Sequence, residues 1–119
     1  LKDFRSLVSW QKAHVLVLAV YRGTASFPVE ERYGLTSQLR RASVSVATNL
    51  AEGCGRGSDA DFGRFVQMAM GSASELEYLL LASNDLGFLD DSVHDELSLK
   101  TVEIKRMLAA LHRRLAPAR

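Results

Sequence analysis

One stretch decides the fold class: residues 92–115, SVHDELSLKTVEIKRMLAALHRRL. Its apolar residues recur at spacings of three, four and seven, as one face of an α-helix requires. This stripe consists of Val93, Leu97, Ile104, Leu108, Leu111 and Leu115. Because Arg106 and Arg113 fall on another face, we expect a half-exposed helix that packs one side against a core.

Three further periodic segments precede this one, and no segment alternates polar with apolar residues as a half-buried strand would. Together they predict helices over about residues 7–24, 36–53, 59–86 and 92–115. Short connections between long helices favour antiparallel neighbours. We therefore expect an all-α chain, with residues 1–119 forming a single antiparallel, up-and-down four-helix bundle.

Breaker residues and caps mark the helix ends. Pro28 ends the first pattern, and the glycine-rich segment 53–58 reads as a helix terminus and loop. Gly87 follows the third pattern as a C-terminal glycine. Two serines, each followed by an aspartate three residues later, predict capping boxes before the third and fourth helices: Ser58 with Asp61, and Ser92 with Asp95.

Composition restricts the compartment. Cys54 is the single cysteine, so the chain forms no internal disulfide and suits a reducing cytoplasm. The first residues lack a secretory signal pattern, and the longest apolar run, Val15–Val20, is too short to span a bilayer. We expect a cytoplasmic protein that is not inserted in a membrane.

Charge is strongly partitioned along the chain. Residues 1–58 hold 8 basic and 4 acidic side chains, residues 59–99 hold 1 and 9, and residues 100–119 hold 6 and 1. The acidic segment can pack beside basic neighbours within or between subunits, which is the explanation we favour. The other explanation is a basic surface for nucleic acid.

The first two helices indicate an oligomer. Val15–Val20 is apolar on every side of a helix, which a lone bundle does not need. In the second helix, Val44, Ala47 and Ala51 form a small apolar face nearly opposite the core face. Two apolar faces predict contact with another copy of the chain. The alternative is one broad core face with incidental alanines.

Adjacent arginines have different expected roles. Arg40 projects beside the small apolar face, so we expect a structural ion pair at a subunit contact, with an acid of the third helix such as Glu75. Arg41 and Arg56 are better placed for phosphate, and the arginines near the C-terminus, Arg113 and Arg114, can add backbone contacts.

No pattern indicates catalysis. His14, His94 and His112 lie at unrelated positions and are expected to face solvent, and no metal-ligand spacing occurs. The loop 53–57 lacks the terminal Gly-Lys-Ser/Thr of a phosphate loop, and Cys54 is expected to be a small loop residue. We expect no enzyme activity, metal, cofactor or small-molecule substrate.

Four motifs are familiar: SWQKA at 9–13, FPVEERYGLTSQLRRASVSVATNLAEG at 27–53, Arg56, and GSASELE at 71–77. Together they resemble the 23S rRNA intervening sequence proteins, a bacterial family similar to the accessory variability protein of diversity-generating retroelements. The family's recurring polar positions match Gln38, Arg40, Arg41, Asn49, Glu52, Arg56, Ser72 and Glu75. Ala47 stands where relatives often have proline, which puts a kink of the second helix in doubt here.

The resemblance implies bundles that assemble as ring-like homopentamers, with basic surfaces for nucleic acid or a nucleic-acid enzyme. Our first hypothesis is therefore a non-catalytic oligomer that binds RNA or DNA backbone through repeated arginines. The second is a structural adaptor for a protein partner, in which the arginines serve subunit assembly.

Overall fold

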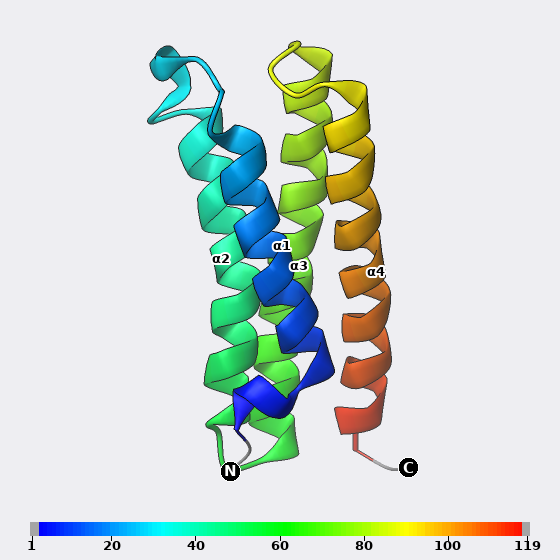
Figure 1. Cartoon of the computed structure of the whole chain (residues 1–119). Coiled ribbons are helices and arrows are strands. Elements are labelled where there is room, and N and C mark those ends of the chain that lie inside the picture. Colours follow the sequence, from blue (N-terminus) through cyan, green and yellow to red (C-terminus); the bar gives the residue numbers. More distant parts are fainter. Residues whose placement is uncertain (1–2, 118–119) are drawn as a thin grey trace.

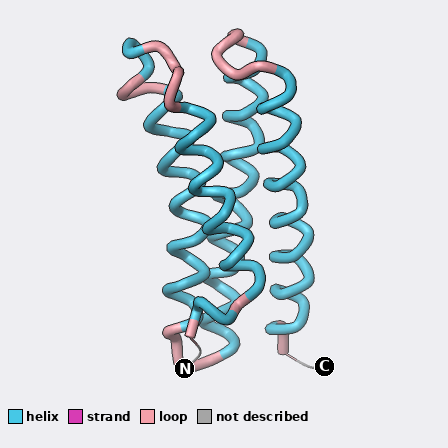
Figure 2. The backbone as a smooth tube through the Cα atoms, viewed as in Figure 1, coloured by secondary structure: helices cyan, strands magenta, loops and turns pink. Residues whose placement is uncertain are grey.

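The computed structural model describes residues 3–117, which contain four α-helices and no strand (Figure 2). The helices are α1 (Val8–Thr24), α2 (Leu35–Cys54), α3 (Asp59–Asp85) and α4 (Asp91–Leu115), and two short 3₁₀ turns span Phe4–Ser6 and Val29–Glu31. The expected helix ends differ from these by one residue at most. The all-α expectation is confirmed, and α2 runs without interruption through Ala47.

Each helix runs antiparallel to the next in an elongated bundle of 48 × 21 × 20 Å (Figure 1). α1 packs on α2 and α4, while α3 packs on the same two helices from the other side, so α1 and α3 are diagonal. The α2–α3 loop and the end of α4 consequently lie at one end of the bundle (Figure 1).

A single apolar cluster fills the middle of the bundle, with contributions from all four helices. Its largest fully buried apolar side chains are Leu16, Val20, Leu39, Val46, Leu50, Val66, Leu76, Leu80, Leu97, Ile104 and Leu108. The hydroxyls of Thr24, Ser43, Ser83 and Thr101 are buried among them, and each donates to a backbone carbonyl of its own helix. These bonds offset the cost of burying polar groups.

Local hydrogen bonds define the helix starts. Ser58 accepts from the Asp61 amide at 3.2 Å, as its capping pattern predicts. At α4 the expected cap was wrong: Asp90, not Ser92, accepts from the Val93 amide, at 2.9 Å. The helix starts one residue early because a carboxylate is a good acceptor at this position. Gly87 has a φ of 82°, the left-handed conformation expected after α3.

The segment after residue 52 was partly misinterpreted. Gly53 and Cys54 are still helical, and both are buried. Cys54, which we expected in the loop, is 3% exposed and belongs to the core. Clustered glycines are an ambiguous signal, since glycine serves close helix contacts as well as loops.

Candidate functional site

Three of the arginines singled out above gather at one end of the bundle. Arg56 lies in the α2–α3 loop, and Arg113 and Arg114 lie in the last turn of α4 (Figure 1). The start of α3, which follows this loop, packs on the end of α4, since a Cβ built on Gly63 would lie 3.9 Å from Leu115 Cβ. We call Arg56, Arg113 and Arg114 the basic end.

All three side chains of the basic end belong to exposed residues, and none is ion-paired within residues 3–117. The Arg56 guanidinium lies 4.6 Å from the centre of the Phe65 ring, a cation–π contact that orients it. Unpaired arginines offer their full set of donors to an anion such as phosphate.

Two arginines that the sequence did not single out lie nearby. Arg5 precedes α1 and bonds Asp3 at 3.2 Å, and Arg64 in the first turns of α3 bonds Asp61 at 3.0 Å. Both pairs are exposed and worth little energy, so these arginines can exchange partners. Nothing in their sequence spacing signals this proximity, which depends on the antiparallel packing.

Arg41 does not join the basic end. It lies in the second turn of α2, 15 residues and therefore about 22 Å of helix before Arg56. There it lines a hollow of about 380 Å³ between α2 and α3, together with Gln38, Ser45 and Glu75. The structure thus brings together Arg41 and Glu75, which we had assigned to different roles.

Polar side chains tie α2 to α3 beside this hollow. The hydroxyls of Ser45 and Ser72 are 2.8 Å apart, and Asn49 donates to the Ser45 carbonyl at 2.9 Å and to its hydroxyl at 3.1 Å. Of the family's recurring polar positions, Ser72 therefore links α3 to α2, while Asn49 bonds Ser45 on its own helix.

Within one chain Arg40 contacts the end of α1, and an ion pair of Arg40 across a subunit contact stays a prediction. Its Nε donates to Thr24 Oγ1 at 3.0 Å and its Nη2 to the Tyr21 carbonyl at 3.4 Å, and its guanidinium lies 4.6 Å from the Tyr21 ring centre. The reason is electrostatic: the carbonyl end of α1 attracts a cation, and α1 lies on the side of α2 to which Arg40 projects.

The small apolar face of α2 is only partly available to a second copy. Ala47 is 8% exposed and belongs to the core, because α2 presents this side to α1. Ala51 is half-buried, whereas Val44 remains 37% exposed. Ala47 therefore leaves little surface for the subunit contact that we expected of it.

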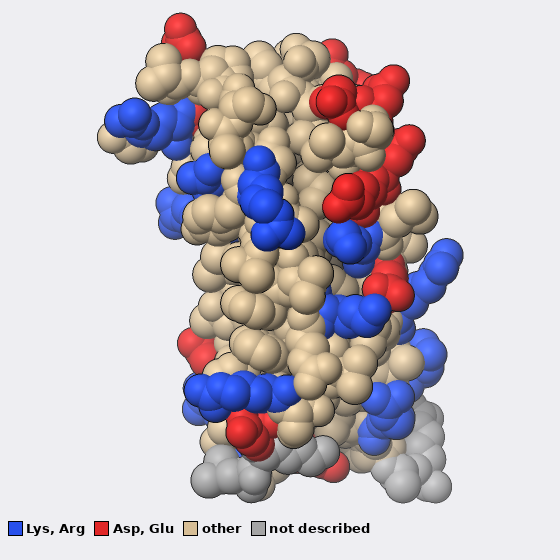
Figure 3. Space-filling model, viewed as in Figure 1, with Lys and Arg blue, Asp and Glu red and all other residues tan. Residues whose placement is uncertain are grey.

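The outer side of α1 supplies more apolar surface. Val15 and Leu18 are 48% and 44% exposed, and Tyr21 is also exposed. Arg40 of α2 contacts Tyr21 of α1. Because the two helices are antiparallel, one turn forward in α2 corresponds to about one turn back in α1, so Val44 lies level with Leu18. Figure 3 shows uncharged surface over the lower half of α1, below a basic side chain. We call Val15, Leu18, Tyr21 and Val44 the apolar strip.

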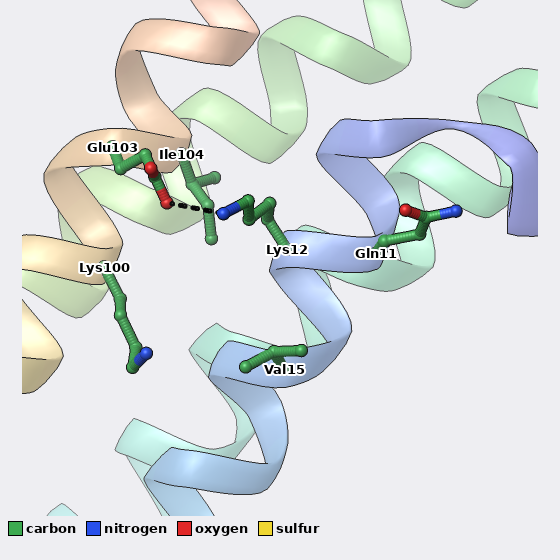
Figure 4. A pocket seen from close by; sticks show the side chains of 6 residues that line it. All are labelled: Gln11, Lys12, Val15, Lys100, Glu103 and Ile104. Atoms are coloured by element: carbon green, nitrogen blue, oxygen red, sulfur yellow. Dashed lines mark ion pairs between the residues drawn. The ribbon is translucent and has the colours of Figure 1, made fainter.

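A groove between α1 and α4 is lined by charged and apolar side chains. Its volume is about 300 Å³, and its lining residues are Gln11, Lys12, Val15, Lys100, Glu103 and Ile104. Figure 4 shows Lys12 reaching toward Glu103, with 3.5 Å between Nζ and Oε1. The six residues include no thiol, hydroxyl or imidazole, and Lys12 and Glu103 pair with each other.

The histidines remain apart. His14 stacks on Trp10 with ring centres 5.1 Å apart, and His94 Nδ1 lies 3.1 Å from Asp95 Oδ1. The His94 side chain is only 19% exposed, so it is less solvent-facing than expected. No three His, Cys, Asp or Glu side chains within residues 3–117 are arranged to hold a metal ion, and no helix there is long and apolar enough to cross a membrane.

The family model of the 23S rRNA-intervening sequence protein matches residues 5–110, nearly the whole chain. The chain belongs to this family. Like the 23S rRNA-intervening sequence family model, the part of the chain that the structure describes spans all four helices of one bundle.

A solved structure supports the fold of this 23S rRNA-intervening sequence family member. The structure is a protein of unknown function from the S23 ribosomal protein family of Bacteroides thetaiotaomicron, which is 18% identical to this chain. The match covers 88% of this chain and 98% of that protein, with a TM-score of 0.80. At this identity the likeness shows the shared fold alone. Among curated proteins none matches the chain.

Proposed function

We propose that this chain forms a non-catalytic, ring-like homo-oligomer, a pentamer, that binds RNA or DNA through backbone phosphates. The observation that carries the proposal is the basic end, where exposed arginines from distant parts of the sequence lie at the same end of the bundle and form no ion pair within residues 3–117. In a cyclic ring all subunits point the same way, so their basic ends form one continuous rim. Repetition then raises affinity without sequence recognition.

The apolar strip supports the assembly half of the proposal. Monomeric proteins rarely expose contiguous apolar surface of this kind, and its members come from two packed helices. A neighbouring subunit that covers Leu18 and Val44 would remove this surface from water. The family name, which refers to 23S rRNA, agrees with a nucleic-acid partner.

A binding titration with structured RNA and with duplex DNA, repeated at several salt concentrations, tests the nucleic-acid half. We expect the logarithm of the binding constant to fall linearly with the logarithm of salt, by about 0.7 to 0.9 for each phosphate neutralised. Absence of binding at low salt, or binding that ignores salt, would contradict the proposal.

Two combined variants test whether the basic end is the nucleic-acid-binding surface. Arg56→Ala, Arg113→Ala and Arg114→Ala combined should weaken binding and flatten the salt dependence. A control that combines Arg22→Ala, Arg32→Ala and Lys100→Ala removes the same charge from exposed or half-buried positions elsewhere, and should bind nearly as well as the parent chain. Equal losses in both variants would point to net charge rather than to the basic end.

The second candidate is an adaptor for a protein partner, and the hollow that holds Arg41 with Glu75 favours it. In that case the arginines serve assembly. Arg41→Ala with Arg56→Ala separates the candidates: intact oligomers with lost nucleic-acid binding support the first, and disassembly supports the second. Copurification of a nucleic-acid enzyme from the source cell would also support the adaptor.

A further inference from the structure

A stripe of side chains on the outside of α4 takes no part in the bundle core. Its members follow one another at spacings of four and three residues, which keeps them on one helix face. They are Asp95, Leu99, Val102, Arg106, Ala109 and Arg113. Four of them are exposed, and Val102 and Ala109 are half-buried. We call these six residues the α4 stripe.

The charge of the α4 stripe changes sign along its length. It begins with an acid, Asp95, and its second half carries Arg106 and Arg113. Figure 3 shows this polarity on the α4 side of the molecule, with acidic side chains above and basic side chains below. Neither arginine has an ion-pair partner within residues 3–117.

Between the charged ends lies unexpected apolar surface. Leu99 is 72% exposed, more than any other large apolar side chain of the four helices. It borders a shallow hollow of about 510 Å³ that Val102, Arg106 and Met107 also line. Leu99, Val102 and Ala109 thus form an apolar centre between the charged ends of the α4 stripe.

We propose that a second copy of this chain docks antiparallel along the α4 stripe, related by a two-fold axis at the level of Ile104. Each residue then faces the one equally far beyond Ile104, so every contact occurs twice. Asp95 meets Arg113 of the second copy, Leu99 packs on its small Ala109, and Val102 lies beside the stem of its Arg106.

The charge pattern favours an antiparallel second copy over a parallel copy or a nucleic acid. A parallel neighbour would place Asp95 against Asp95 and Arg113 against Arg113, which is repulsive. A nucleic-acid backbone would meet Asp91, Asp95 and Glu96 at one end of the surface. Only an antiparallel copy joins acid to base at both ends while it covers Leu99.

The contact is small. From Asp95 to Arg113 the α4 stripe spans 18 residues, about 27 Å of helix. One helix face of this length buries less than a standard interface of about 1,600 Å². The dimer should therefore be weak and should weaken further as salt rises.

This contact goes beyond the proposed function and does not depend on it. The ring uses the apolar strip and parallel neighbours, whereas the α4 stripe joins antiparallel copies. Because Arg113 belongs to the basic end as well, a polynucleotide bound there competes with the second copy.

Cysteine cross-linking tests the register directly. Leu99→Cys and Ala109→Cys are made in separate chains, mixed, and oxidised gently with oxidised glutathione. We expect a disulfide between the two variants and little within either alone, because equivalent positions are offset by 10 residues, about 15 Å. A disulfide needs Cα atoms within about 7 Å. The native Cys54 is buried and should add little background.

Met68→Cys on α3, which is exposed, is the matched control and should cross-link with neither variant. Failure of the mixed pair, or self-linking of Leu99→Cys as strong as mixed linking, would overturn the proposal. These readouts report geometry alone, so they are independent of nucleic-acid binding.

A charge exchange provides the second measurement. In sedimentation equilibrium, Asp95→Arg and Arg113→Asp should each weaken the contact at least about tenfold, a loss of about 1.4 kcal/mol. The double variant should recover most of the affinity, since it restores opposite charges across the axis. If the double variant is as weak as the singles, the Asp95–Arg113 contact is wrong. Because both residues are exposed, the variants should fold normally.

Discussion

Gly53 of α2 lies directly against Phe62 of α3: a Cβ on Gly53 would come within 2.8 Å of the Phe62 ring atom Cδ1. The same Cβ would lie 2.9 Å from Phe65 Cβ. No ordinary Cβ contact is this short, so the absence of a side chain at residue 53 lets the two helices approach closely. This crossing lies just before the loop that carries Arg56, and it sets where that arginine emerges.

Gly53→Ala should destabilise the chain by about 1 to 3 kcal/mol, because the new methyl group forces the two phenylalanines or the helices apart. Denaturant unfolding monitored by circular dichroism measures this change. Gly71→Ala is the matched control, since nothing lies within 4 Å of its added Cβ. There the gain in helix propensity should stabilise by up to about 1 kcal/mol. Equal effects at both positions would contradict the close-approach argument.

Arg40→Ala should lower the free energy of unfolding by about 1 kcal/mol, because it removes hydrogen bonds to the end of α1 and the stacking on Tyr21. Arg40→Lys keeps the positive charge but loses the planar guanidinium group, so its free energy of unfolding should lie between those of the parent chain and Arg40→Ala. The neighbouring Arg41→Ala should change stability by less than about 0.5 kcal/mol. A larger loss for Arg41→Ala than for Arg40→Ala would contradict the structure.

Asp90→Ala should lower the melting temperature more than Ser92→Ala does, because Asp90 caps α4. Differential scanning calorimetry compares the two variants directly. A larger drop in melting temperature for Ser92→Ala would instead indicate that Ser92 caps α4, as its spacing with Asp95 predicted.

The Asp90 cap should also depend on pH. The Val93 amide and the Ser92 hydroxyl donate to the carboxylate and hold the pKa of Asp90 below its usual value. The folded chain then binds fewer protons than the unfolded chain, so the contribution is present above the unfolded pKa and lost as pH falls through the folded pKa. The difference in the free energy of unfolding between the parent chain and Asp90→Asn should therefore shrink in acid. A difference that stays constant with pH would contradict the role of the Asp90 carboxylate.

Leu18→Asp combined with Val44→Asp should reduce the particle mass to that of one chain, 13.1 kDa, without unfolding it. The two carboxylates would be buried in the apolar strip if a neighbour covered it. Light scattering after gel filtration measures the mass, and circular dichroism checks the fold. Gln67→Asp on the exposed side of α3 is the control. A parent chain that is already monomeric would exclude the ring.

The extents of the helices were predictable because their signals are local. Apolar spacing, Pro28 and Gly87 act within a few residues, and they set the four helices to within a residue at each end. The cap of α4 was missed because Asp90, Asp91 and Ser92 are all acceptable caps in sequence. Only the backbone geometry distinguishes them.

The candidate site was predictable only as a set of residues. The sequence suggested Arg56, Arg113 and Arg114 as candidates for phosphate binding but did not show that they lie at the same end of the bundle. It also placed Arg41 with them, whereas the structure places it about 22 Å of helix away. The rotation of each helix and its alignment with its neighbours decide which arginines lie at the same end of the bundle, and long-range packing sets both.

By itself, the sequence determined that this chain is helical, which apolar stripe of the last helix faces the core and where charge changes sign. Those properties follow from the period of the α-helix and from side-chain chemistry. The tertiary structure alone decided that Arg40 binds the end of α1, that Ala47 is buried and that the loop carrying Arg56 lies at the same end of the bundle as the last turn of α4. Such contacts depend on how helices rotate and pack, which no local pattern specifies.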